Sequence, residues 1–389
     1  YVCNAAMLRE LSRRTLNISV PSIPDFVDEV PDFVFDESSF IPGEAVQRYD
    51  REITFMGYPR SGNRGTGTRN FIILLGTTSL TAGFVTALEA RLQNAMKAYP
   101  NIDGIVAVAH TEGGHHHPNN RELLLRTLAG FMVNPNVGAV LAVDYGHEAL
   151  TIAALKDYMT AHHYPLDEVL HHFQTISGSF QDNLESASRT VEGWLDAVNA
   201  SQRVPTSISH LKIALQCGGS DAFSGVSGNP LAAWVAKEII AYGGSANLAE
   251  TDELVGAERY MLKNVRDIET ARRFVATLDR FKTWAGWHGH AVTGNPSGGN
   301  LLRGLYNIYL KSLGAAAKRN PGSRLDYVIN YGDPMPEPGY YFMDSPGNDL
   351  ESIAGQVASG CNMIFFVTGN GSITNFPFVP TIKIMTTTR

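Results

Sequence analysis

The sequence predicts an α/β protein in which a parallel-sheet, Rossmann-like domain is followed by a second α/β domain. From Asn70 onward, short apolar runs alternate with longer segments of helical periodicity, the order that builds parallel sheets covered by helices. The polar stretch 200–207 interrupts this alternation before it resumes. We therefore predict an extended N-terminal arm at 1–51, the Rossmann-like domain at 52–204 and the second α/β domain at 205–389.

The same patterns predict the arm, strands and helices of the chain. Residues 1–50 mix Pro, Asp, Glu and Phe without a sustained period, which predicts an arm that packs on the α/β domains or on a neighbouring subunit. His171 and His172 lie in a strand-like segment, and we expect them to be structural. Strands are predicted at 71–75, 104–109, 138–143, 211–215, 246–249, 326–330, 361–367 and 381–385. Helices are predicted at 82–98, 121–132, 147–161, 181–199, 231–242, 254–262 and 268–285.

Composition narrows the class of protein. The chain has 389 residues, of which 44% are apolar and 18% charged, as in ordinary globular proteins. No apolar run approaches the roughly 18 residues that span a bilayer, and no signal-peptide layout is visible, so we expect no membrane partner and a cytoplasmic location. A formal charge of −7 without a basic cluster argues against nucleic acid as a partner. Three widely spaced cysteines predict reduced thiols.

Polar residues follow the strands of the first domain. Ligands of such sheets bind beyond the carboxyl ends of the strands, and four of the twelve histidines lie in one of these loops, 110–117. His147 and Glu148 follow the next strand. Imidazole and carboxylate ligands suit Fe²⁺, Mn²⁺ or Zn²⁺, although a solvated polar loop would carry the same residues. The metal ligands that we predict are His110, His115, His117 and His147.

The segment 215–230 is the most informative of the chain. An apolar strand runs into glycines and small polar residues before a helix begins, and such a junction exposes backbone N–H groups to an anionic ligand. Cys217 is predicted to be a ligand, a reactive thiol or a small buried residue. Asp221 is predicted to bind metal or substrate, or to cap the following turn, with Ser220 and Ser224 beside the substrate.

This segment, Cys217 to Gly225, resembles the signature of the altronate/galactarate dehydratase family, which removes water from sugar acids. The resemblance covers about residue 52 to the end, and the matching segments occur in the family's order, which makes coincidence improbable. The other matches are Gly57-Tyr58 with Gly65 to Asn70, Asn295 to Asn300, Met343 to Asp349, and Thr368 to Gly371 with Val379 to Lys383.

The resemblance implies a hydro-lyase that converts an aldonate or aldarate to a 2-keto-3-deoxy acid with help from a divalent metal, Fe²⁺ being favoured. We expect a small-molecule sugar acid as the partner and a homo-oligomeric state. Removing a proton next to a carboxylate and expelling a hydroxyl needs a cation, a base and an acid. We predict His147, Glu148, Cys217, Asp221 and His288 as catalytic residues. The predicted substrate contacts are Arg69, Asn70, Ser220, Ser224, Asn295, Asn300, Asn348, Asp349, Thr368 and Asn370.

The chain departs from the family pattern at three positions. The family often places cysteines where this chain has Thr81, Gly114 and His147, so the same thiolate site cannot form. A histidine-rich mononuclear site is one replacement. The alternatives are a related carbon–sulfur lyase that expels sulfite from a sulfonated hydroxy acid, and a noncatalytic binding or scaffold relative.

Overall fold

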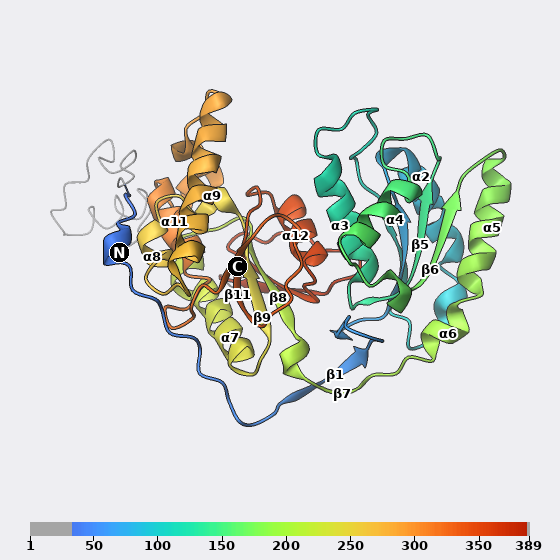
Figure 1. Cartoon of the computed structure of the whole chain (residues 1–389), viewed down its shortest axis with the longest axis horizontal. Coiled ribbons are helices and arrows are strands. Elements are labelled where there is room, and N and C mark those ends of the chain that lie inside the picture. The colour runs from blue at the N-terminus through green and yellow to red at the C-terminus, as the bar shows by residue number, and fades with distance from the viewer. Residues whose placement is uncertain (1–32, 387–389) are drawn as a thin grey trace, which may run out of the picture.

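The computed structural model describes residues 33–386 and contains two parallel sheets that lie side by side (Figure 1). The four-stranded sheet has the order β4-β3-β5-β6, and the six-stranded sheet has the order β10-β11-β9-β8-β12-β13. Every strand pair in both sheets is parallel. The predicted fold class, one α/β domain followed by another, is confirmed.

The first sheet is buried because its strands are almost wholly apolar, as parallel strands covered on both faces must be. Residues 72–75 of β3, for example, are all completely buried. Its strands are β3 (Phe71–Gly76), β4 (Gly104–Val108), β5 (Val137–Asp144) and β6 (Leu170–Thr175). Its helices are α2 (Ala82–Leu92), α3 (Arg121–Val133), α4 (Ile152–Ala161), α5 (Phe180–Glu192) and α6 (Leu195–Asn199). Strand β6 contains His171 and His172, as their strand-like setting predicts.

The predicted helices differ from the structure in their bounds, and three in the first domain differ by several residues. Helix α4 begins at Ile152 and not at residue 147, because the Thr151 hydroxyl caps it and the Asp144 carboxylate accepts a hydrogen bond from the Ile152 N–H. Helix α2 ends at Leu92, and a separate 3₁₀ turn covers 95–98. The predicted helix 181–199 is divided into α5 and α6, with Gly193 and Trp194 between them.

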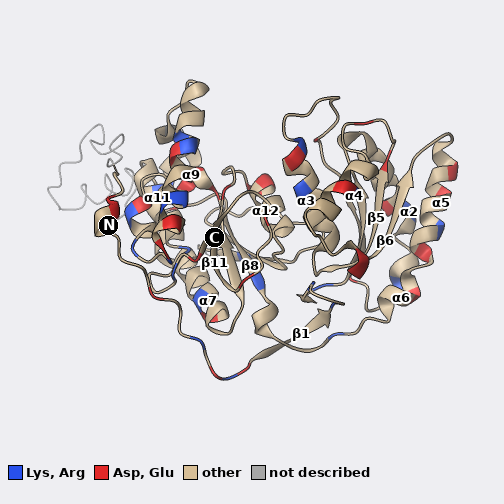
Figure 2. Ribbon diagram, in the orientation of Figure 1, with Lys and Arg blue, Asp and Glu red and all other residues tan. Residues whose placement is uncertain are grey.

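The second sheet positions the motifs of the C-terminal half. Figure 2 shows that most charged residues lie on helices and loops, which leaves the strands largely apolar. The strands are β8 (Lys212–Cys217), β9 (Ser245–Leu248), β10 (Tyr327–Ile329), β11 (Gly339–Met343), β12 (Met363–Thr368) and β13 (Thr381–Met385). The helices include α7 (Asn229–Ala241), α8 (Glu258–Met261), α9 (Ile268–Trp287), α10 (Gly298–Leu302), α11 (Ile308–Ala316) and α12 (Asp349–Ala358). Elements β11, α10, α11 and α12 were absent from the sequence-based prediction.

The predicted linker 200–207 contains a strand. Strand β7 (Val204–Ser207) pairs antiparallel with β1 (Thr54–Pro59), which also pairs with the two-residue strand β2 (Thr66–Gly67). Backbone hydrogen bonds across this ribbon favour extended chain over a free linker. In Figure 1 the ribbon lies at the base of the molecule, between the two sheets.

The described part of the N-terminal arm runs along the second domain. The Gly43 N–H donates to the Val265 carbonyl, and the Tyr49 N–H donates to the Ala241 carbonyl. Residues 1–32, which belong to the same predicted arm, lie outside the described residues. No helix within 33–386 combines the length and the apolar character needed to cross a membrane.

Helices α3 and α12 join the two sheets through a continuous apolar core. The Phe131 ring of α3 packs edge-on against Phe376 and Phe378. The Asn134 side chain donates to the carbonyls of Val357 and Cys361, so polar contacts also cross the junction. The two halves therefore meet across a packed interface and not through the connecting chain alone.

Candidate functional site

The C-terminal motifs gather at the carboxyl edge of the six-stranded sheet. Cys217 ends β8, and the loops after the other strands approach it closely. Gly219 has a φ of 62°, and a Cβ there would collide with the Asn370 side chain. A Cβ at Gly218 would collide with the Asp349 carboxylate in the same way. Only glycine permits this approach, which explains the glycine pair of the signature.

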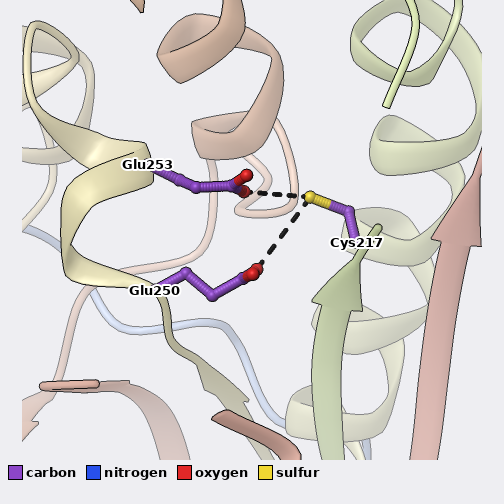
Figure 3. A group of neighbouring side chains, drawn as sticks. All are labelled: Cys217, Glu250 and Glu253. Carbon is purple, nitrogen blue, oxygen red and sulfur yellow. Dashed lines mark hydrogen bonds between the residues drawn. The ribbon is translucent and has the colours of Figure 1, made fainter. Parts of the chain in front are cut away.

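A buried cluster of four side chains lies at this edge (Figure 3 shows three of them). The Cys217 thiol donates to Glu253 Oε2 at 3.1 Å and lies 4.0 Å from Glu250 Oε2. Lys318 Nζ donates to Cys217 Sγ at 2.9 Å and to Glu250 Oε2 at 3.2 Å. None of the four residues is more than 6% exposed, so these are ionisable groups withdrawn from water.

Two loops aim the carboxylates at the thiol. Glu250 follows β9 with a φ of 72°, a conformation that costs a residue other than glycine about 1 to 3 kcal/mol. Its N–H donates to Ser345 Oγ, which fixes this turn against the loop after β11. Glu253 lies in the 3₁₀ turn Thr251–Leu254, and its second oxygen, Oε1, is 3.0 Å from Lys311 Nζ on α11.

The electrostatics of the cluster separate the two carboxyl groups. Burial raises the pKa of Glu253, but the Lys311 and Lys318 ammonium groups outweigh burial and lower that pKa to about 2. Burial and the nearby Glu253 charge raise the pKa of Glu250 well above its ordinary value. Burial also raises the pKa of the Cys217 thiol. Two carboxyl groups whose pKa values are pushed apart are typical of sites that move protons.

A pocket of about 410 Å³ is lined by Asp252, which lies between Glu250 and Glu253 in the chain. Asn295 donates a hydrogen bond to Asp252, whose pKa is raised to about 6 by burial and by the neighbouring Glu253 charge. Two predicted residues, His288 and Asn295, thus lie in one pocket with an acid that the sequence did not indicate. The residues that line it are Asp252, Phe281, Trp284, Ala285, His288, His290, Ala291, Val292 and Asn295. A larger hollow of about 500 Å³, along α3 and α4, contains none of the predicted site residues.

The predicted histidine ligands do not form one group. His110 follows β4, and its Nε2 lies 3.0 Å from the Gly76 carbonyl at the end of the neighbouring strand β3. His147 Nδ1 lies 3.1 Å from the Tyr145 carbonyl in its own loop after β5. His115 and His117 are exposed. Within the described residues, the one set of three metal-ligating side chains with atoms inside 4.8 Å of each other is Cys217, Glu250 and Glu253.

Three predicted site residues have their polar atoms engaged in local structure. The Glu148 carboxylate accepts hydrogen bonds from the N–H groups of Tyr145 and His147, so it shapes the loop and is not free to act as a base. Asp221 accepts hydrogen bonds from the N–H and hydroxyl of Ser224, and this places both in a turn cap. These hydrogen bonds give the three residues a positioning role, and their catalytic or substrate-binding role stays a prediction.

Arg69 and Asn70 lie at the amino end of β3, opposite the edge where ligands of parallel sheets bind. Asn70 is completely buried, and its amide donates to the carbonyls of Asn101 and Val198. Arg69 lies 3.8 Å from the Asp103 carboxylate. These contacts hold the first domain together, and the predicted contact of Arg69 and Asn70 with the substrate stays a prediction.

The remaining predicted residues build or border the loops of the site. The Asn300 amide donates to the Ser220 carbonyl, and the Asn348 side chain caps α12. Thr368 accepts a hydrogen bond from the Gly371 N–H. Asp349 is half-buried and Asn370 is exposed, so these two side chains remain available to a ligand.

Sequence reasoning did not identify Glu250, Asp252, Glu253, Lys311 or Lys318. One signal was present, because the acidic run 250–253 directly follows a predicted strand, at the edge where such sheets bind ligands. The two lysines gave no comparable signal, since α11 itself was not predicted.

Cys217, Glu250 and Glu253 form a possible metal-binding triad. Sulfur and carboxylate ligands together suit a borderline divalent cation, so the donor types fit. Lys318 already places an ammonium group against two of these three side chains. Any metal in the triad must share or replace that contact.

Comparison with known proteins agrees with this architecture. The family model described as D-galactarate/altronate dehydratase, C-terminal, matches residues 208–389, and the second-domain model of D-galactarate dehydratase/altronate hydrolase matches 57–199. Altronate dehydratase of Escherichia coli (strain K12) is 31% identical over 87% of this chain and 67% of its own length. The Bacillus subtilis (strain 168) altronate dehydratase is 30% identical over 86% of this chain and 66% of its own length.

A protein named for a different activity is similar to nearly the same extent. The (2R)-sulfolactate sulfo-lyase subunit beta of Chromohalobacter salexigens is 29% identical over 85% of this chain and 81% of its own length. The chain spans about two thirds of the length of the altronate dehydratases. On both family models and these similarities, the chain belongs to the D-galactarate/altronate dehydratase family.

Proposed function

We propose that this protein is a hydro-lyase that dehydrates an aldonate or aldarate to a 2-keto-3-deoxy acid. The observation that carries the proposal is the pocket lined by Asp252, His288 and Asn295. Asp252 is the chain neighbour of Glu253, which belongs to the buried cluster of Cys217, Glu250, Glu253 and Lys318. The names of the relatives, altronate dehydratase and galactarate dehydratase, support the same substrate class.

The residues of the pocket match the needs of this reaction. The proton next to a carboxylate is only weakly acidic, so a base must remove it while an acid protonates the departing hydroxyl. Asp252 and His288 are the candidates for these proton transfers. Asn295 supplies a short amide group in the pocket that hydrogen-bonds to a polyol, and Phe281 and Trp284 provide aromatic walls. Outside the pocket, Asn370 supplies a second amide group and Lys311 adds positive charge beside the cluster.

We propose that a divalent metal, Fe²⁺ in preference to Mn²⁺ or Zn²⁺, binds to Cys217, Glu250 and Glu253. When bound, such a cation supplies positive charge that stabilises the enediolate formed after proton removal. This proposal moves the metal from the predicted histidine loop to the triad. The cytoplasmic location and the homo-oligomeric state stay predictions.

The test is an activity screen with anaerobically purified protein. The protein is incubated with a panel of aldonates and aldarates after chelation, with and without Fe²⁺, Mn²⁺ or Zn²⁺. The 2-keto-3-deoxy product is measured as its semicarbazone. Asp252→Asn serves as the pocket variant and Asp157→Asn, an exposed carboxylate on α4, as the matched control. Absence of product across the panel with every metal would contradict the proposal and favour a noncatalytic relative.

A second candidate is a carbon–sulfur lyase that expels sulfite from a sulfonated hydroxy acid. The observation that favours it is the 29% identity to a sulfolactate sulfo-lyase subunit over 85% of this chain. Both reactions begin with proton removal next to a carboxylate and differ in the leaving group. Sulfite release from sulfolactate, in the absence of turnover of any sugar acid, would select this alternative.

A further inference from the structure

Lys318 holds an unusual position for a lysine, because its side chain is completely buried. It follows α11, and its carbonyl accepts a hydrogen bond from the Tyr340 hydroxyl, which anchors the backbone at this point. Buried lysines are rare unless paired, and here the partners are the thiol and carboxylates of the triad. The ammonium group thus already neutralises the groups that would bind a metal.

The Lys318 ammonium group lies close to all three side chains of the triad. Lys318 Nζ lies 2.9 Å from Cys217 Sγ, 3.2 Å from Glu250 Oε2 and 3.9 Å from Glu253 Oε2. One ammonium group therefore faces an atom of every member of the triad. A divalent cation would coordinate the same sulfur at about 2.3 Å.

We infer that the Lys318 ammonium is the resident cation of the triad and competes with a divalent metal for it. A metal bound to Cys217 Sγ while Lys318 keeps its own contact would lie no more than about 5 Å from Nζ, with three positive charges in a buried site. The inference rests on the proposed function only in taking the triad as the metal site. Metal binding then requires the Lys318 side chain to leave the sulfur.

Lys311 provides a matched comparison within the same site. It is also largely buried, with 12% of its side chain exposed, and it carries the same charge. Its ion pair goes to Glu253 Oε1, the carboxylate oxygen that points away from the thiol contact. Removing either lysine deletes one positive charge near the triad. Only the removal of Lys318 also takes the ammonium group away from the sulfur.

The test measures metal binding in the absence of substrate. Chelated wild-type protein, Lys318→Met and Lys311→Met are titrated anaerobically with Mn²⁺ by calorimetry and with Co²⁺, whose thiolate charge-transfer absorption reports a bond to Cys217. We expect Lys318→Met to bind Mn²⁺ at least tenfold more tightly than the wild type and to show the Co²⁺–thiolate band. We expect Lys311→Met to bind within about threefold of the wild type.

Equal tightening by both variants would overturn the inference, because it would show a general effect of charge. Stoichiometric Co²⁺–thiolate binding by the wild type, as strong as in Lys318→Met, would overturn it as well. If Lys318→Met does not fold without metal, Lys318→Arg tests the same point, since it retains the cation and should bind Co²⁺ as weakly as the wild type. A Co²⁺–thiolate band in Lys318→Arg would count against competition. This experiment measures metal binding and no turnover. Its result therefore does not depend on whether the protein proves to be a dehydratase.

Discussion

The substitution Gly130→Ala should weaken the junction between the two halves of the protein. Gly130 lies in α3, and a Cβ at this position would collide with the Ala358 carbonyl oxygen of α12 and lie 2.8 Å from its carbonyl carbon. Carbon atoms in protein interiors stay at least about 3.4 Å apart, so the helices would have to separate by about 1 Å. Overpacking of this kind costs about 1 to 3 kcal/mol.

The higher helix propensity of alanine opposes this loss of stability. Alanine is a better helix former than glycine by about 1 kcal/mol, so the same substitution also stabilises α3. The net change in the free energy of unfolding is therefore a loss of up to about 2 kcal/mol. Gly286→Ala is the matched control, because Gly286 also lies in a helix, α9, and a Cβ there would meet no atom within 4 Å. That variant should gain about 0.5 to 1 kcal/mol.

The assay is urea unfolding of the wild type and both variants, followed by circular dichroism at neutral pH. The two variants should move in opposite directions from the wild type, which removes the helix-propensity contribution from the comparison. If Gly130→Ala proves as stable as Gly286→Ala, the close approach of α3 and α12 is not rigid and the reasoning fails.

Two further predictions concern α9 and the pocket. Asp267 caps α9, and although burial raises its pKa, hydrogen bonds from Thr270 and Arg266 lower it to about 2. Asp267→Ala should therefore lower the free energy of unfolding by about 1 kcal/mol at pH 7, and this difference from the wild type should shrink as the pH falls from 4 towards 2. Asp267→Asn keeps the cap. Unfolding curves at pH 7 and pH 3 check both variants. Asp252→Asn should lower the turnover number at least about 100-fold in the semicarbazone assay, and a variant that keeps wild-type turnover would remove Asp252 from the mechanism. Since the raised pKa of Asp252 means that its stabilising protonated form is lost as the pH rises through about 6, the same variant should be no less stable than the wild type at pH 7.5.

Much of the fold was predictable because a strand that is buried on both faces of its sheet has an uninterrupted run of apolar residues in the sequence. Strands β3, β5, β8 and β12 each show such a run, and each was predicted within two residues of its observed bounds. Strand β11 was missed because its aromatic run, 339–343, follows prolines and glycines that favour a loop. Helix α12 was missed for the same reason, since its first residues belong to the Asn348–Asp349 loop motif.

The site was predictable only where chemistry lay inside a sequence motif. Cys217, His288 and Asn295 were identified from their segments, and the structure places them at or beside the cluster. Glu250 and Glu253 join Cys217 because β9 lies next to β8, a neighbour relation that apolar runs do not encode. Lys318 reaches the thiol from a distance of 101 residues along the chain, so no local pattern could indicate the contact.

The pairing of β1 with β7 makes the first domain a closed loop of chain whose entry and exit lie together. During synthesis the last two residues of β1 can pair early with β2, but residues 54–57 find their partner only when β7 is made, about 150 residues later. The four-stranded sheet can form in that interval, because all its strands lie between the two. Once the ribbon closes, two hydrogen-bonded strands connect the halves of the protein, so any rotation of one half against the other would have to bend both strands at once.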